Sequence, residues 1–280
     1  MRQPESFVRR IRGQLESLST AERRLAELLL DFPGELASYN ASELATLAGV
    51  SNATVTRLIQ RLGYGTYEDA RRHAREERQS GSPLFQAEAR TGPAAEGALQ
   101  AHLQQSQVNL ARMFDRLTEA AVAEIVQALL DAPQVLIFGS RSSHAFATYL
   151  RWQIYQVRPQ VTALPGPGET LGEHLAHLTA RDCVVVFGMR RQTAQMGALL
   201  QASARAKSRV LFISDQTSPD FDAATWSIQC HCAGPGPLDN HVAVMALCDL
   251  LATHVVQAAG PAGRKRLAAI EVLHEDIGEL

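Results

Sequence analysis

Four short apolar runs restrict the fold of the second half of this 280-residue chain more than any other feature. They cover residues 135–138, 161–164, 183–187 and 210–213, with a weaker fifth run at 226–230. Segments with apolar residues every three to four positions lie between most of them, notably 144–157 and 193–206. Apolar strands that alternate with helices are typical of a parallel sheet covered on both faces. The pattern therefore predicts a doubly wound, flavodoxin-like α/β domain.

The first 80 residues show the helical period alone, which predicts an all-α domain. Two of its helices have a capping box as their start signal, Ser19 with Glu22 and Asn40 with Glu43. In such a box, each side chain satisfies the other residue's free backbone N–H. A further helix is expected from about Thr66 to Arg78.

Residues 40–61 fit a helix-turn-helix motif, with Gly49 in the turn. Small or apolar residues face inward from its first helix at Leu44, Ala45 and Ala48. The outward positions of the second helix are Asn52, Ala53, Thr56, Arg57, Gln60 and Arg61, and Ser51 at its start is placed for a phosphate contact. No Asp or Glu occurs from residue 52 to 62, which favours binding of double-stranded DNA in the major groove. The alternative is a helical hairpin with a solvated polar face.

Two loops after predicted strands carry candidate ligand groups. The first contains Ser140, Arg141, Ser142 and Ser143, and the second contains Arg190, Arg191 and Thr193. Both lie at the carboxyl edge of the expected sheet, where ligands bind in open α/β folds. Hydroxyl and guanidinium groups there predict a site for a small anionic metabolite. The alternative for Arg190 and Arg191 is a pair of surface or subunit-contact side chains.

Composition excludes several classes of protein. The net charge is −2, so nucleic-acid binding must be argued locally, and the first 80 residues carry 12 Arg and 11 acids. The four cysteines are too few for a disulfide framework. In Cys230-His231-Cys232, the alternation of a strand would bury the two sulfurs on one face and direct the His to the other. We expect no metal or cofactor. The lack of a signal peptide or apolar span predicts a cytoplasmic protein with no membrane partner.

The N-terminal motifs resemble those of RpiR-type bacterial transcription regulators. The matching segments are Leu18 to Arg24, Ser42 to Ala45, Gly49 to Arg57 and Leu62 to Tyr64. The unit from Val135 to Val157 resembles the start of a sugar isomerase (SIS) domain, the effector-binding half of that family. The resemblance covers nearly the whole chain and implies an operator-binding domain joined to a sensor of sugar phosphates.

Two loops depart from the family pattern. Family SIS domains often have Gly-x-Gly-x-Ser after the first strand, and Arg141 stands at the second Gly here. The usual Ser-x-Ser-Gly-x-Thr after the third strand is Gly188 to Thr193, which retains only the Thr. This is similar to a variant branch with paired arginines, and it leaves a sugar phosphate and another acidic metabolite, such as a sugar acid, both open.

The leading hypothesis is a ligand-responsive transcription regulator, not an enzyme, that binds DNA as a homodimer or tetramer. Residues 1–80 are expected to bind DNA, 81–95 to form a linker, 96–260 to bind the effector and 261–280 to form a helical tail. One alternative is a sugar-phosphate isomerase, with His144, Glu169 and Glu173 as candidate bases. Another is a regulator whose SIS domain only dimerises.

Overall fold

The computed structural model describes residues 6–79, 97–189, 193–216, 218, 221–236 and 238–279. The chain divides into two compact units, each considered separately below. One unit consists of residues 1–102 with 234–239, and the other consists of residues 103–233 with 240–280.

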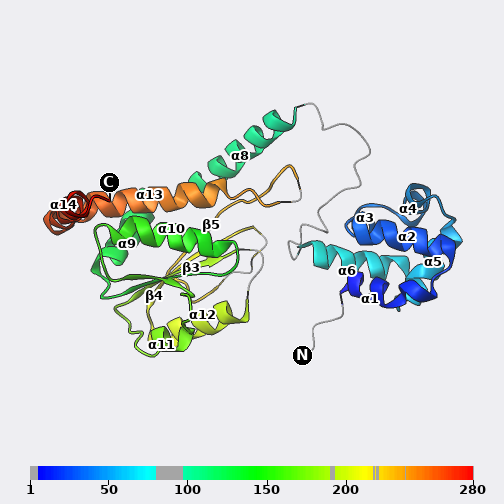
Figure 1. Ribbon diagram of the computed structural model, residues 1–280, viewed down its shortest axis with the longest axis horizontal. Helices are drawn as coiled ribbons and strands as arrows, with labels where there is room; N and C mark the ends of the chain where they lie inside the picture. The colour runs from blue at the N-terminus through cyan, green and yellow to red at the C-terminus, as the bar shows by residue number, and fades with distance from the viewer. Residues whose placement is uncertain are drawn as a thin grey trace. The chain divides into compact units, whose positions relative to one another are not determined.

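The N-terminal unit is helical, as the sequence predicts (Figure 1). Its helices are α1 (Phe7–Gln14), α2 (Thr20–Asp31), α3 (Glu35–Ser38), α4 (Ala41–Ala48), α5 (Asn52–Arg61) and α6 (Tyr67–Gln79), with a 3₁₀ turn at Leu15–Ser17. They enclose one apolar core whose largest members include Phe7, Leu25 and Leu58, all fully buried. Both predicted capping boxes are present, at Ser19 with Glu22 and at Asn40 with Glu43. The short helix α3 was not predicted, because a helix of one turn is too short to show the spacing of apolar residues that marks a helix.

The C-terminal unit contains a parallel five-stranded sheet in the order β2-β1-β3-β4-β5. The strands are β1 (Val135–Gly139), β2 (Val161–Leu164), β3 (Cys183–Gly188), β4 (Arg209–Ser214) and β5 (Trp226–Gln229). The helices of the remaining chain are α8 (Ala98–Phe114), α9 (Glu119–Asp131), α10 (Ser143–Tyr155), α11 (Leu171–Leu175), α12 (Ala194–Ala206), α13 (Val242–Ala258) and α14 (Gly260–Ile277).

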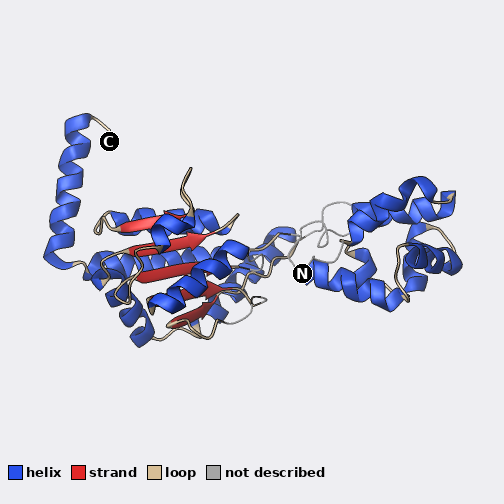
Figure 2. Cartoon of the chain, turned by 90° about the horizontal axis from the view of Figure 1, so that it is seen from below, coloured by secondary structure: helices blue, strands red, loops and turns tan. Residues whose placement is uncertain are grey.

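Helices cover both faces of this sheet, so the predicted doubly wound fold is confirmed (Figure 2). Alternate strand residues point to opposite faces. Ile137 and Val185 pack on the side of α9, α10 and α13, whereas Phe138 and Val186 pack on the side of α12. Burial on both faces explains why these strands are apolar without alternation.

The strand order reverses between β1 and β3, which pair directly with Gly139 opposite Phe187. In open α/β sheets, such a switch point leaves a crevice at the carboxyl ends of the two strands. The predicted ligand loops therefore flank the position where this topology favours binding.

The predicted tail helix is present as α14, which bends by 103° from α13. Among the described residues, no single helix is long and apolar enough to cross a membrane, and only the bent pair of α13 and α14 meets the length and composition requirements together.

Candidate functional site

Helices α4 and α5 form the predicted helix-turn-helix motif. Gly49 ends α4 in the left-handed conformation, with φ of 63°. Leu44, Ala45 and Ala48 are buried on α4, and Val55 and Leu58 are buried on α5. This packing leaves the other face of α5 exposed.

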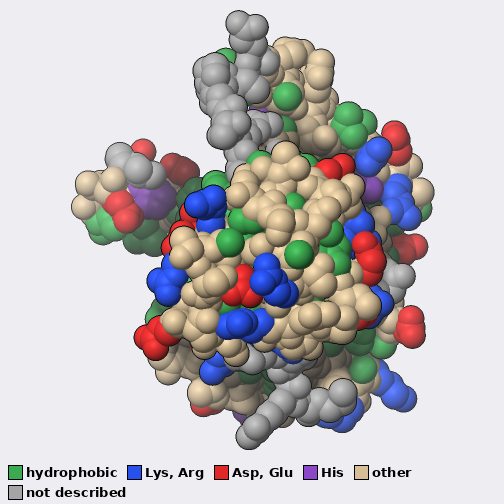
Figure 3. Space-filling view, turned by 90° about the vertical axis from the view of Figure 1, so that its right-hand side faces the viewer, with side chains coloured by type: hydrophobic (Ala, Val, Ile, Leu, Met, Phe, Trp, Pro, Cys, Tyr) green, Lys and Arg blue, Asp and Glu red, His purple; other side chains and the backbone are tan. Residues whose placement is uncertain are grey.

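The exposed face of α5 carries the seven predicted DNA-contacting residues. Ser51, Asn52, Ala53, Thr56, Arg57, Gln60 and Arg61 are all exposed. Figure 3 views the N-terminal unit from the side on which α5 lies in Figure 1, where basic and acidic side chains are interspersed among uncharged groups. On this face, the basic side chains therefore form no continuous patch.

The seven side chains differ in what else they contact. The Ser51 hydroxyl accepts a hydrogen bond from the Thr54 N–H, which caps α5. Asn52 donates from Nδ2 to the Ser42 hydroxyl on α4 at 3.1 Å. The guanidinium of Arg57 donates within its own helix, from Nε to the Ala53 carbonyl at 3.2 Å.

Arg61 is exposed, but its guanidinium contacts other parts of the same unit. Its Nη1 donates to the Ser17 carbonyl at 2.7 Å, and its Nε lies 3.8 Å from a carboxylate oxygen of Glu22. Glu22 is buried, and its hydrogen bonds with Ser19, reinforced by the charge of Arg61, hold its pKa below the usual range. The C-terminal end of α5 is thereby attached to the start of α2.

Arg24 is a basic residue that the sequence reasoning missed. It lies on α2, and its Nη1 donates to the Gly49 carbonyl at 3.3 Å. The turn of the motif thus has a guanidinium beside it. The amphipathic period of α2 indicates that Arg24 is exposed. It does not indicate that the side chain contacts Gly49, which is 25 residues away in sequence.

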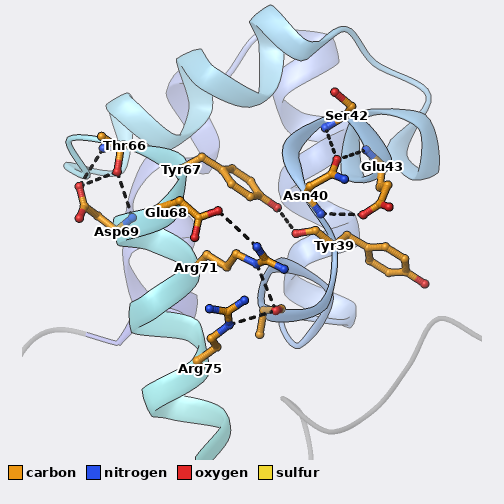
Figure 4. Close-up of polar contacts among 11 residues, drawn as sticks. Tyr39, Asn40, Ser42, Glu43, Thr66, Tyr67, Glu68, Asp69, Arg71 and Arg75 are labelled. Atoms are coloured by element: carbon orange, nitrogen blue, oxygen red, sulfur yellow. Dashed lines mark hydrogen bonds and ion pairs between the residues drawn. The ribbon is translucent and has the colours of Figure 1, made fainter.

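Helix α6 supports the start of α4 from the other side (Figure 4). Tyr67 donates to the Tyr39 carbonyl at 3.0 Å, and Arg71 and Arg75 donate to the Ala37 carbonyl at 3.3 and 3.4 Å. Burial raises the pKa of Tyr67 to about 12, so its hydroxyl remains a donor at neutral pH. These bonds fix the segment from which α4 begins.

In the C-terminal unit, the loop after β1 makes a tight turn into α10. A Cβ at Gly139 would lie 2.2 Å from the Ser143 carbonyl oxygen, so only glycine fits there. Arg141 has φ of 57° and is exposed, while Ser143 is buried. This left-handed backbone is a conformation that glycine adopts more readily than any other residue.

The backbone N–H groups that begin α10 are partly occupied. The N–H groups of Ser143, His144 and Ala145 donate to the carbonyls three residues earlier. Ser142 makes no side-chain cap to the helix. An anion at this loop would therefore depend on the Ser140 and Ser142 hydroxyls and on Arg141 more than on the helix start.

The carboxyl end of β3 lies beside that of β1, because the two strands are paired. A Cβ at Gly188 would come within 2.4 Å of the Phe212 ring, which excludes a side chain. Thr193 caps α12 by accepting a hydrogen bond from the Met196 N–H at 3.4 Å, and its hydroxyl hydrogen can still be donated. Arg190 and Arg191 lie outside the described residues.

Three further polar residues belong to this region. Ser218 donates to the Gly188 carbonyl at 2.6 Å and contacts the buried carboxylate of Asp215 at 3.0 Å. The buried Nδ1 atom of His144 has no hydrogen-bond partner among the described residues, while its Nε2 lies 3.4 Å from the Thr148 hydroxyl. Sequence reasoning missed Ser218 and Asp215, since neither belongs to a motif.

Two of the candidate isomerase bases, Glu169 and Glu173, make polar contacts with neighbours between β2 and the end of α11. Glu169 pairs with His174 at 3.0 Å, and Glu173 accepts a hydrogen bond from Thr170. That hydrogen bond holds the pKa of Glu173 below its usual range, which makes the exposed carboxylate a weaker base for proton abstraction.

The interpretation of Cys230 and Cys232 as buried sulfurs is confirmed. Burial raises the pKa of the Cys230 thiol to about 12, which disfavours the thiolate that a metal would require. Within the described part of the chain, no group of three or more His, Cys, Asp or Glu side chains is placed to hold a metal ion.

Comparison with known proteins gives two family matches. The helix-turn-helix domain of the rpiR family matches residues 6–81, and the SIS domain matches residues 128–254.

A sequence relative matches nearly the whole chain. The HTH-type transcriptional regulator HexR of Escherichia coli (strain K12) is 21% identical over 272 residues, which are 95% of this chain and 93% of HexR.

Two solved structures share the fold. The sugar isomerase domain of an RpiR transcription factor from Sphaerobacter thermophilus has a TM-score of 0.58 at 20% identity and covers 63% of this chain and 99% of its own. The Vibrio vulnificus NanR protein complexed with ManNAc-6P has a TM-score of 0.55 at 17% identity and covers 96% of this chain and 98% of its own.

Proposed function

Because this chain joins an rpiR-family helix-turn-helix domain to a SIS domain, we propose that it is a ligand-responsive transcription regulator. The acid-free, exposed face of α5 is the observation that carries the proposal. A relative over 95% of the chain is itself named a transcriptional regulator. The protein acts on operator DNA in the cytoplasm and is not an enzyme.

The contacts on α5 divide its residues by role. Arg57 and Gln60 read base edges. Both side chains are exposed, and in the described part of the chain no hydrogen bond joins either of them to another helix. Asn52, Ala53 and Thr56 line the same groove, and Ser51 meets a phosphate at the start of the helix. Arg61 contributes mainly by orienting α5 on α2, with its remaining N–H groups available to the DNA backbone.

The effector site lies at the switch point between β1 and β3. Its proposed ligand groups are Ser140, Arg141, Ser142, Ser143, Arg190, Arg191 and Thr193. The anionic metabolite is a sugar phosphate or a sugar acid, and NanR complexed with ManNAc-6P supports the former. Because Ser143 is buried and Arg141 is exposed, we assign the charge recognition to Arg141 and the shape of the loop to Ser143.

The domain division follows these two functions. Residues 1–80 bind DNA, 81–95 link the domains, 96–260 bind the effector and 261–280 form the tail. A homodimer, or a tetramer made of two dimers, presents two helix-turn-helix motifs to a pseudo-palindromic operator. The effector and the operator then change each other's affinity by the same factor.

The test is fluorescence anisotropy with promoter fragments flanking the protein's own gene, at fixed salt, with and without sugar phosphates and sugar acids. We expect specific binding that one compound shifts. Specific binding that no compound shifts would favour an SIS domain that only dimerises. No preference over random DNA would refute the regulator and direct attention to isomerase activity.

A further inference from the structure

The amide of Asn52 is the polar side chain best placed to reach a base from the first turn of α5. Asn52 is exposed at the first position of this helix, and the N-terminal residues of a recognition helix contact base edges. The Ser51 hydroxyl instead caps the helix at the Thr54 N–H. The Thr56 hydroxyl donates to the Asn52 backbone carbonyl at 3.2 Å, and Ala53 has no polar side-chain atom.

This amide is held from the other helix of the motif. Its Nδ2 atom donates to the Ser42 hydroxyl on α4 at 3.1 Å, so the bond spans the turn that joins the two helices. A side-chain amide has two N–H donors and one carbonyl oxygen. The bond to Ser42 uses one N–H and leaves the second N–H and the carbonyl oxygen for another partner.

Ser42 is a firm support because its backbone is bonded on both sides. Its N–H donates to the side-chain oxygen of Asn40 at 3.0 Å (Figure 4), and its carbonyl accepts from the Thr46 hydroxyl at 3.0 Å. The Asn40 N–H donates in turn to the Glu43 carboxylate at 2.8 Å. The Ser42 hydroxyl is therefore carried by a fixed backbone, and a hydrogen bond to it restricts how the Asn52 amide can turn.

The two groups that remain on the amide match one base. In the major groove, adenine presents an acceptor at N7 and a donor at N6, and an asparagine amide pairs with both through one N–H and its oxygen. Guanine presents two acceptors there, one of which would face the amide oxygen. An amide that turned freely would adapt its N–H groups and oxygen to either base. An amide held in one orientation discriminates between them.

We propose that Ser42 is a positioning residue, which holds the Asn52 amide in the orientation that reads an adenine in each operator half-site. The effect of Ser42 is on discrimination between bases, because phosphate contacts elsewhere on the motif carry the affinity for DNA of any sequence. The inference deepens the proposed function and rests on it, since it names the base that the first residue of α5 reads.

The test is fluorescence anisotropy of the full chain at fixed salt, with an operator and each of its single base-pair variants. Asn52→Ala should remove the preference for one A·T pair in each half-site, roughly tenfold in affinity. Ser42→Ala should weaken that same preference by about threefold, as the loss of one neutral hydrogen bond would, and leave the affinity for random DNA unchanged. Thr46→Ala is the matched control. It removes an exposed hydroxyl from the same helix, and the preference should not change.

Two further variants separate positioning from a general effect on structure. Ser42→Ala combined with Asn52→Ala should discriminate no worse than Asn52→Ala alone, because Ser42 acts through the amide. Ser42→Thr keeps the hydroxyl and should keep the preference. Thermal unfolding of the same variants should change little, since both side chains are exposed.

The outcomes distinguish this inference from the function on which it rests. A wild-type chain with no preference over random DNA would refute the regulator. Specific binding in which Ser42→Ala discriminates like the wild type, or in which its effect adds in full to that of Asn52→Ala, would refute the positioning role alone. Specific binding in which Asn52→Ala affects a G·C pair would refute the recognition of adenine.

Discussion

The guanidinium of Arg61 joins two helices that are far apart in sequence, by donating to the Ser17 carbonyl at 2.7 Å. It also lies 3.8 Å from the Glu22 carboxylate. The side chain predicted to read DNA is therefore also a structural brace for α5.

Replacing Arg61 should lower stability as well as operator affinity. Arg61→Ala removes a charge-assisted hydrogen bond and an ion pair that are partly exposed, so we expect a loss of about 1 kcal/mol in the free energy of unfolding. Urea denaturation of the full chain measures it. Arg61→Lys keeps the charge but not the geometry and should recover only part of the loss. Unchanged stability in Arg61→Ala would show that the brace contributes nothing.

Replacing Arg57 should weaken DNA binding far more than it changes stability. Its guanidinium hydrogen-bonds to the Ala53 carbonyl of its own helix and acts on Glu22 only as a minor charge, so Arg57→Ala leaves the packing of α5 intact. Loss of a guanine contact costs about 1–3 kcal/mol of operator affinity. Anisotropy at fixed salt, with thermal unfolding beside it, separates the effects. If Arg57→Ala combined with Gln60→Ala binds operator and random DNA like the wild type, α5 is not the recognition helix.

The turn of the motif depends on a glycine backbone. Gly49 has φ of 63°, so Gly49→Ala should destabilise the chain by about 1–2 kcal/mol without any steric clash. Gly13→Ala is the control, because Gly13 lies within α1 with no atom near its added Cβ. That variant should be stabilising by about 0.5–1 kcal/mol. Unfolding free energies that change in the same direction would contradict the role of the turn.

Arg141 allows the effector loop to be tested without unfolding it. Glycine suits the φ of 57° at this position, so Arg141→Gly relieves backbone strain while making the unfolded chain more flexible. We expect the stability to change by less than about 1 kcal/mol and the effector-induced shift in operator binding to be lost. A full response in Arg141→Gly would exclude this guanidinium from the site.

Glu22 should make the stability depend on pH. Its pKa is lowered in the folded chain, chiefly by hydrogen bonds from Ser19, so the folded state favours the charged form. The stabilisation is present above the ordinary glutamate pKa near 4.5 and is lost as the pH falls through the lower folded value. The difference in stability between wild type and Glu22→Gln should therefore shrink on acidification. A difference that is constant from pH 7 to acid would refute the assignment.

The order and type of the elements were predictable from local pattern. The apolar runs from Val135 to Ile213 predicted β1 to β4, because strands buried on both faces need apolar residues throughout. The capping boxes at Ser19 and Asn40 placed two helix starts correctly, because these bonds join residues three apart. The exposed face of α5 was also predictable, because the helical period depends only on residues three and four apart.

Only the tertiary structure decided which of those exposed side chains are available to DNA and which are held by other helices. Arg57 and Arg61 are both arginines and lie four residues apart on α5, yet the first hydrogen-bonds within its own helix and the second reaches Ser17. The adjacency of Ser218 and Asp215 to the loop after β3, and the direction in which α14 leaves α13, were equally out of reach. Each depends on contacts between distant segments, whereas the sequence by itself determined what neighbours along one helix or strand could specify.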